Sequence, residues 1–289
     1  MKKSLWIFAT ILLFFIGDRI GGVLLKKAVD QSQFRYSRMY TGKAASDILL
    51  VGNSRGLIFY QPHIEKITGK KTFNISYNGL PIDLAKSLVA DYLDNYQPKK
   101  MIVDITMCDR FNNQMISGFN LYTPYSKNIS ELIQETDQNG FYAAKLSHLY
   151  RYNSELFQRS LFYLNKNDED WLLDREINDF MVANVQQEEP YNIGFTTPML
   201  THLNDMVKNA QAKGVEVHLV INPYFPAFAK QIENLEQLKS EVERATGLKV
   251  KDYAMAVMET KGFADYQHLN KYGAALYLNQ LLKDNILDK

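Results

Sequence analysis

The sequence predicts an α/β protein built on a doubly wound parallel sheet. Short apolar runs of strand length, such as Asp47–Val51 and Met101–Ile105, alternate with stretches whose apolar residues recur every three or four positions. Strands that alternate with helices form βαβ units, and helices on both faces of a parallel sheet bury its strands completely. With 289 residues, 46% hydrophobic and 22% charged, the chain is long enough for one large globular domain.

The first 27 residues are expected to be a signal anchor. Two lysines precede the segment Leu5–Leu25, whose apolar character is interrupted by Asp18 and Arg19. As a helix its 21 residues span about 31 Å, enough to cross a bilayer with Asp18 and Arg19 near the headgroups. The leading lysines favour a cytoplasmic N-terminus and a domain on the extracytoplasmic (periplasmic) side. A cleaved signal peptide is the alternative, although no small-residue cleavage site follows.

The rest of the chain is expected to be a polar linker, 28–46, followed by the α/β domain, 47–289. Strands are predicted at 47–51, 72–76, 101–105 and 215–221, and helices at 60–68, 81–96, 227–245 and 272–282. Residues 112–200 interrupt this alternation and are predicted to be an aromatic-rich helical insertion. Such an insertion is either a structural element or a lid over a substrate cleft.

The charged and metal-binding side chains exclude several classes of function. The net charge is +1 and no long run of like charge occurs, so we expect no nucleic-acid partner. Cys108 is the only cysteine, which rules out an intramolecular disulfide. The spacing of His63, His148, His202 and His218 is not that of metal ligands, so no metal site is expected.

Two distant segments carry the residue types of a serine nucleophile and its base. The segment Gly52–Gly56 fits the pattern G-x-S-x-G with Ser54 at its centre, directly after the first predicted strand. Near the other end, Asp265 precedes His268 by three residues, just before a helix that Asn270 is expected to cap. An acid at this spacing can bind Nδ1 of the histidine and leave Nε2 free to accept a serine proton. We therefore expect Ser54, His268 and Asp265 to meet at the carboxyl edge of the sheet.

These motifs together resemble the SGNH (GDSL-type) hydrolase family, in its membrane-anchored bacterial envelope form. The first family block is similar to Gly52-Asn53-Ser54, and the last to the D-x-x-H-L-N pattern that begins at Asp265. The second block is similar to FNISYNG, with Asn74 and Gly79 in the matching positions. The resemblance implies a flavodoxin-like three-layer fold, a triad of Ser54, His268 and Asp265, and no cofactor or metal. Gly56 then has no role in the pattern.

The resemblance also implies an oxyanion hole formed by the N–H groups of Ser54 and Gly79 and by an asparagine side chain after the third strand. Cys108 stands where that asparagine is expected, and a thiol is a weak hydrogen-bond donor. Loss of one oxyanion donor can lower turnover by about 10²–10³.

Three polar residues in or next to the matching blocks, Asn53, Arg55 and Asn78, are candidate substrate-binding residues. Arg55 could bind an anionic or carbohydrate group, or it could form a structural ion pair.

The resemblance implies a serine esterase or O-acyltransferase that acts on ester-linked acyl groups of cell-surface polysaccharide. The expected partners are an acylated carbohydrate or another small ester, and the bacterial membrane through the N-terminal helix. The alternative is a non-catalytic SGNH-like module that binds glycan or assists an envelope acylation system.

Overall fold

The computed structural model describes residues 2–109, 111–167 and 171–288, without the side chains of residues 2–4, 108 and 109. The chain divides into two compact units, each of which is described by itself. Unit 1 contains the chain up to residue 43 and the stretch 113–168, and unit 2 contains 44–112 and 169–289. The expectation for Cys108 concerns a side chain that lies outside the described ones.

Unit 2 is built on a five-stranded parallel sheet in the order β2-β1-β3-β4-β5, which confirms the predicted fold class. This is the flavodoxin-like strand order. The strands are β1 Ile48–Val51, β2 Thr72–Asn74, β3 Lys100–Asp104, β4 Glu216–Ile221 and β5 Val250–Asp252. All residues of β1, β2 and β3 are buried, as expected for strands covered on both faces.

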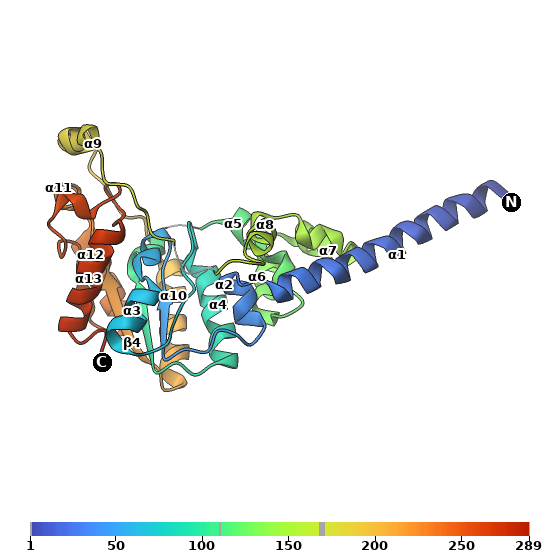
Figure 1. Cartoon of the computed structure of the whole chain (residues 1–289), viewed down its shortest axis with the longest axis horizontal. Helices are drawn as coiled ribbons and strands as arrows, with labels where there is room; N and C mark the ends of the chain where they lie inside the picture. The colour runs from blue at the N-terminus through green and yellow to red at the C-terminus, as the bar shows by residue number, and fades with distance from the viewer. Residues whose placement is uncertain (1, 110, 168–170, 289) are drawn as a thin grey trace. The chain divides into compact units, whose positions relative to one another are not determined.

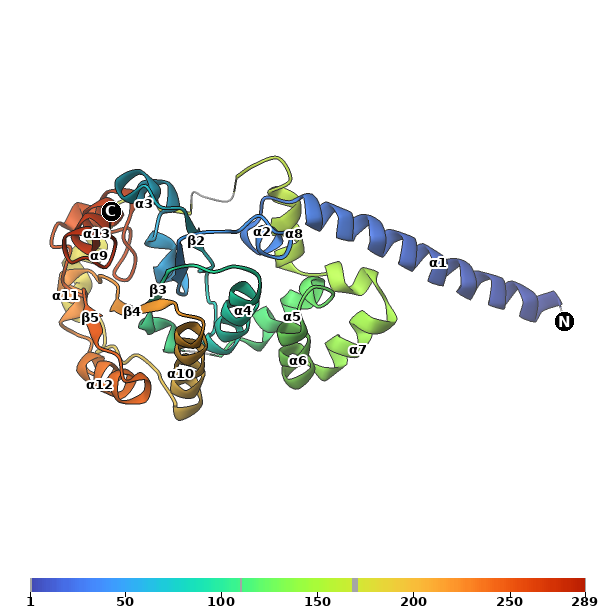
Figure 2. The ribbon, with the colours of Figure 1, turned by 90° about the horizontal axis from the view of Figure 1, so that it is seen from below.

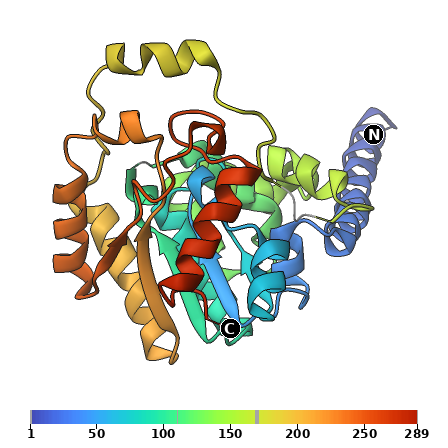
Figure 3. The same ribbon diagram turned by 60° about the vertical axis from the view of Figure 1, so that its left-hand side comes forward.

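Helices cover both faces of this sheet, as Figures 2 and 3 show. On one face lie α4 Ile82–Asn95, α10 Thr197–Ala212 and α12 Leu235–Thr246, and on the other lie α3 Gln61–Thr68 and α13 Lys271–Lys283. The shorter elements of unit 2 are η1 Ser54–Ile58, η2 Ile105–Asp109, α9 Asp179–Asn184, η5 Val185–Gln187, α11 Pro226–Ala229 and η6 Thr260–Gly262. The single helix expected at 227–245 is thus two helices, α11 and α12.

Unit 1 is helical and begins with the 30-residue helix α1, Lys2–Gln31. Its other elements are α2 Arg35–Tyr40, α5 Asn113–Gly118, η3 Phe119–Tyr122, α6 Lys127–Thr136, α7 Gln138–Leu146, η4 Leu149–Tyr152 and α8 Glu155–Phe162. The structure differs here from the expected linker, 28–46. The ring of Tyr36 in α2 is buried against Phe119 and Tyr122, with centroids 4.9 and 6.3 Å apart. Because these aromatic contacts bury α2, it packs with the first half of the expected insertion.

Among the residues that the structure describes, one segment, Leu5–Gln31 in α1, is long and apolar enough to cross a membrane, by length and composition alone. Most of its apolar side chains are exposed in the structure; Leu5, Leu13 and Phe14 are 69–75% exposed. Within unit 1, Figure 1 shows the first half of α1 extending beyond α7.

Candidate active site

Ser54 lies at the carboxyl end of β1, in a turn that two glycines make possible. The side chain of Asn53 accepts a hydrogen bond of 3.0 Å from the second N–H of η1 and so caps that helix. A Cβ atom on Gly52 would stand 2.8 Å from Cα of Gly56, and one on Gly56 would stand 2.4 Å from Oγ of Ser76. Close packing therefore requires both glycines, which gives Gly56 a structural role.

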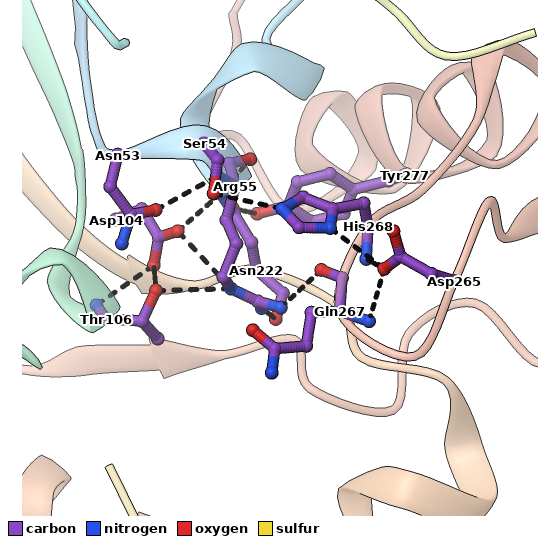
Figure 4. Close-up of polar contacts among 10 residues, drawn as sticks. All are labelled: Asn53, Ser54, Arg55, Asp104, Thr106, Asn222, Asp265, Gln267, His268 and Tyr277. Carbon is purple, nitrogen blue, oxygen red and sulfur yellow. Dashed lines mark hydrogen bonds and ion pairs between the residues drawn. The ribbon is translucent and has the colours of Figure 1, made fainter. Parts of the chain in front are cut away.

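The structure brings Ser54, His268 and Asp265 together (Figure 4). Nε2 of His268 lies 2.9 Å from Oγ of Ser54, and Nδ1 lies 2.8 Å from Oδ1 of Asp265. The same carboxylate oxygen accepts hydrogen bonds of 2.9 Å from the backbone N–H groups of Gln267 and His268. These bonds fix the loop that presents the imidazole. With Nδ1 protonated, Nδ1–H donates to Asp265 and Nε2 accepts from the Ser54 hydroxyl.

Asp265 stays ionised over the working pH range of most enzymes. Partial burial raises the pKa of this carboxyl. The hydrogen bond and charge of His268 and the two backbone N–H groups outweigh burial and lower the pKa to about 2. The second oxygen, Oδ2, lies 3.3 Å from a guanidinium nitrogen of Arg175, whose side chain is mostly exposed. A permanently charged Asp265 is suited to stabilise an imidazolium at His268.

Gly79 lies in a turn after β2, with φ at +69°. The turn is closed by a 3.1 Å hydrogen bond from the N–H of Leu80 to the carbonyl of Tyr77, and its third residue has the positive φ that favours glycine. The side chain of Asn112, which the sequence did not single out, donates a 3.2 Å hydrogen bond to the Gly79 carbonyl. Among the described residues, the N–H of Gly79 has no acceptor, so it is available to a ligand.

Arg55 is buried beneath the site, which corrects the expectation that it binds substrate. Its side chain is 4% exposed, and its nitrogens donate to the carbonyls of Gln267, at 2.6 Å, and Asn222 and to the hydroxyl of Thr106. The guanidinium also stacks 3.4 Å from the centroid of the Tyr224 ring. The guanidinium of Arg55 thus binds groups of the protein itself. The structure contains the alternative expected role, a structural ion pair, which Arg55 forms with Asp104. The bond to Gln267 links the Ser54 turn to the His268 loop.

Asp104 is the carboxylate of this buried network and is fully buried at the end of β3. Its oxygens lie 3.8 Å from Nε of Arg55 and accept hydrogen bonds from the hydroxyl and N–H of Thr106 and the amide of Asn222. Burial raises the pKa of Asp104, and these partners oppose that rise. The hydroxyl of Tyr277 donates to Asn222 at 2.7 Å. This network was not predicted from the sequence, although polar residues that end two apolar strands indicate it.

A pocket of about 500 Å³ opens beside Ser54, within the usual size range of small-molecule sites. Its polar lining is formed by Ser54, Asn78, Gly79, Arg175, Asp265 and His268. Its apolar lining is formed by Leu57, Ile58, Trp171, Leu172, Leu173 and Leu269. Within the part of the expected insertion that is described, 171–175 is the segment that lines the pocket. A smaller cavity of about 170 Å³ shares Leu172 with it.

The other two candidate substrate-binding residues differ in their surroundings. Asn78 is exposed and lines the pocket, so it is accessible to a ligand. Asn53 is 4% exposed and caps η1. Its side chain therefore has a structural partner, which departs from the expected role in substrate binding.

Comparison with known proteins gives only weak structural similarity. No family model matches the chain, and no curated protein matches it. Among solved structures, the chain is similar to a Bacteroides fragilis protein described as a "putative acylhydrolase", with 10% sequence identity. The match covers 85% of this chain and 88% of that one, with a TM-score of 0.40. A likeness at this level carries no argument about activity, which therefore depends on the site.

Proposed function

We propose that the protein is an SGNH-type serine hydrolase, an esterase or O-acyltransferase that acts on ester-linked acyl groups. The observation that carries this proposal is the hydrogen-bonded series Asp265–His268–Ser54, with distances of 2.8 and 2.9 Å, at the edge of a pocket. A nucleophile, a base and a group that orients the base are the parts that covalent acyl transfer needs.

In the proposed reaction, Oγ of Ser54 attacks the ester carbonyl while Nε2 of His268 takes the hydroxyl proton. The tetrahedral intermediate collapses, the bond to the alcohol oxygen breaks, and His268 returns the proton to the departing alcohol. Water or a sugar hydroxyl then attacks the acyl-Ser54 ester, again losing its proton to His268. In the second collapse the bond to Oγ of Ser54 breaks, His268 returns the proton to that oxygen, and an acid or a new ester is released. Asp265 stabilises the imidazolium in each half of the reaction.

Two backbone N–H groups are proposed to stabilise the oxyanion. Ser54 is the first residue of η1, and the first N–H groups of a helix have no acceptor within the helix. Gly79 contributes an N–H from the turn described above, and both residues line the pocket. Fixed donors of this kind stabilise charge as it develops, without the reorganisation that water would need.

The lining of the pocket supports an ester whose acyl group is partly apolar. Leu57, Leu172 and Leu269 provide an apolar wall in the same pocket as Ser54, and such a wall binds carbon chains by removing them from water. By family resemblance, the proposed substrate is an acylated cell-surface polysaccharide. The apolar helix α1 supports anchoring in the bacterial membrane, and we propose an extracytoplasmic location for unit 2.

The test is covalent labelling of the full chain with a fluorophosphonate, together with hydrolysis of nitrophenyl esters. Labelling at Ser54 is expected, and Ser54→Ala and His268→Ala should each abolish both labelling and hydrolysis. Ser240→Ala, which alters an exposed serine on α12, is the matched control and should behave as the wild type.

The second candidate function is a non-catalytic SGNH-like module that binds glycan or assists an envelope acylation system. The cysteine in the position expected for the third oxyanion donor, Cys108, favours it. A folded chain that neither reacts with fluorophosphonate nor hydrolyses any ester would support this module and contradict the esterase.

A further inference from the structure

Unit 1 exposes a group of large apolar side chains outside α1. They lie at the end of α7 and in η4, and we call them the α7–η4 patch: Tyr142 is 51% exposed, Leu146 76%, Leu149 41% and Tyr150 44%. Tyr142 and Leu146 are four residues apart on α7 and so share a face of that helix. A group of exposed apolar side chains is typical of a surface that binds another protein or a membrane.

The patch is fastened to α1 at one level of that helix. The carboxylate of Asp18 accepts hydrogen bonds from the N–H groups of His148 and Leu149, at 2.8 and 3.0 Å. Two glycines of α1 allow close contact: a Cβ on Gly21 would stand 2.9 Å from a methyl of Leu149, and one on Gly22 would stand 2.4 Å from Cβ of His148. The patch therefore lies beside residues 18–22 of α1.

The length of α1 determines how deep residues 18–22 lie in a bilayer that the helix crosses. A bilayer has a hydrocarbon core about 30 Å thick, which takes about 20 helical residues. The exposed apolar run that ends at Ile16 covers only about 18 Å from Leu5. A span of about 30 Å from Leu5 reaches Leu24, and Val23 and Leu24 are also 64% and 62% exposed. A spanning α1 therefore brings residues 18–22, and the patch beside them, to within about 9 Å of one edge of the hydrocarbon core, on its apolar side.

The charged groups at this level already have partners in the protein. Asp18 is 4% exposed and also accepts a 2.5 Å hydrogen bond from the Ser147 hydroxyl. Arg19 lies 3.5 Å from Asp18 and donates to the carbonyl of Leu146 at 3.0 Å. Paired charges next to a bilayer cost far less than isolated ones. Tyrosines such as Tyr142 and Tyr150 are also the side chains that favour the membrane interface.

We infer that the α7–η4 patch inserts into the bilayer beside α1, so that the protein is held by a helix and a second apolar surface. The occupant of this surface is lipid, because Leu146 and Leu149 lie against residues 19–21 of α1, next to the exposed apolar side chains of residues 20, 23 and 24 of that helix. The inference rests on the proposed spanning of α1. It gives Asp18 a definite role, since that carboxylate ties η4 to the helix at the depth where the patch meets lipid.

The test measures contact with lipid at single positions of the full chain. In a Cys108→Ser background, the variants Leu146→Cys and Leu149→Cys carry a fluorescent label, and the protein is reconstituted into phosphatidylcholine vesicles that contain a doxyl-lipid quencher. Gln134→Cys, an exposed site on α6, is the matched control outside the patch. Leu13→Cys marks the part of α1 expected in the hydrocarbon core, and circular dichroism checks that each variant is folded.

We expect the labels at 146 and 149 to lose fluorescence nearly as the label at 13 does, while the label at 134 is unaffected. Quenching at 13 without quenching at 146 and 149 would overturn the inference and leave the anchor intact. Absence of quenching at all four positions would overturn both the insertion of the patch and the membrane anchoring by α1. Equal quenching at 134 and 146 would also overturn it, because the patch would then not be the surface that meets lipid. None of these readouts depends on catalysis, so the esterase proposal is judged separately.

Discussion

Replacing Arg55 by methionine is expected to lower the melting temperature by about 6–20 °C. The guanidinium is 4% exposed and Asp104 is 0% exposed, so solvent does not weaken their interaction. Removal of one partner from a buried ion pair costs about 3–5 kcal/mol, because the other charge is left uncompensated. For a unit of roughly 150–250 residues, 1 kcal/mol corresponds to about 2–4 °C, which gives the stated range.

The assay is thermal unfolding of the full chain in detergent, followed by circular dichroism. Arg244→Met is the matched control, since Arg244 is 74% exposed in its ion pair with Glu241 and exposed ion pairs contribute little. In the double variant Arg55→Met/Asp104→Asn, the loss should be smaller than the sum of the single losses, because no buried charge is left unpaired. If Arg55→Met melts no lower than Arg244→Met, the buried network does not stabilise the fold as argued.

A conservative replacement separates the charge of Arg55 from its shape. Arg55→Lys keeps a cation but cannot donate at once to Gln267, Asn222 and Thr106, because the ammonium lacks the planar fork. We expect this variant to fold and to label more slowly with fluorophosphonate, since the bond to Gln267 holds the loop of His268. Wild-type labelling rates for Arg55→Lys would show that this bond does not position the imidazole.

Four further predictions concern the pocket. Because the pKa of Asp265 is lowered to about 2, its charge stabilises the native state at pH values above its ordinary pKa and is lost only as the pH falls toward 2. Protonation of Asp265 should therefore not lower kcat/KM above about pH 3, and an acid limb above pH 3 that disappears in Asp265→Asn would contradict this assignment. Asp265→Asn should fold and turn over about 10⁴-fold more slowly, and an unchanged kcat would refute its role. Cys108→Asn should raise kcat on an acetyl ester with little change in KM, by supplying a side-chain donor; a lower kcat would mean that the block assignment is wrong. Leu172→Ala should shift the preference toward longer acyl chains, by about fourfold for each methylene that enters the enlarged cavity. The control Leu146→Ala, which alters a residue of α7, should leave the chain-length profile unchanged. Equal profiles for both variants would refute the apolar wall.

Most of the sheet could be predicted from the sequence because β1, β2, β3 and the second half of β4 are buried on both faces. Burial on both faces demands continuous apolar runs, and β1, β3 and β4 fall within one residue or so of the predicted strands. The strand β5 escaped prediction because it has three residues, of which only Val250 is buried. Helix α2 escaped for a different reason: its buried tyrosine, Tyr36, packs on aromatic rings about 80 residues away, which local composition does not reveal.

Part of the candidate site could likewise be predicted from the sequence, and part depends on the fold. The spacing of Asp265 and His268 could be interpreted from the sequence, because three residues on one loop allow a carboxylate to reach Nδ1 without help from the fold. The proximity of Ser54 agrees with what the motifs indicate, yet the 2.9 Å contact to a residue 214 positions away is set by the stacking order of the strands. The catalytic roles of these residues stay predictions.

The sequence by itself determined four of the five strands, the apolar N-terminal helix and the local motifs, since these depend on periodicity and on short spacings. Only the tertiary structure decided what Arg55 and Asp18 do. The residues next to each of these charged side chains in the sequence are compatible with a side chain that faces solvent or a ligand. Arg55 is instead enclosed by the ends of β3 and β4 and by the His268 loop. Asp18 is enclosed by residues 147–149, at the start of η4. A charge is buried only where distant segments bring it partners, and those partners are fixed by packing.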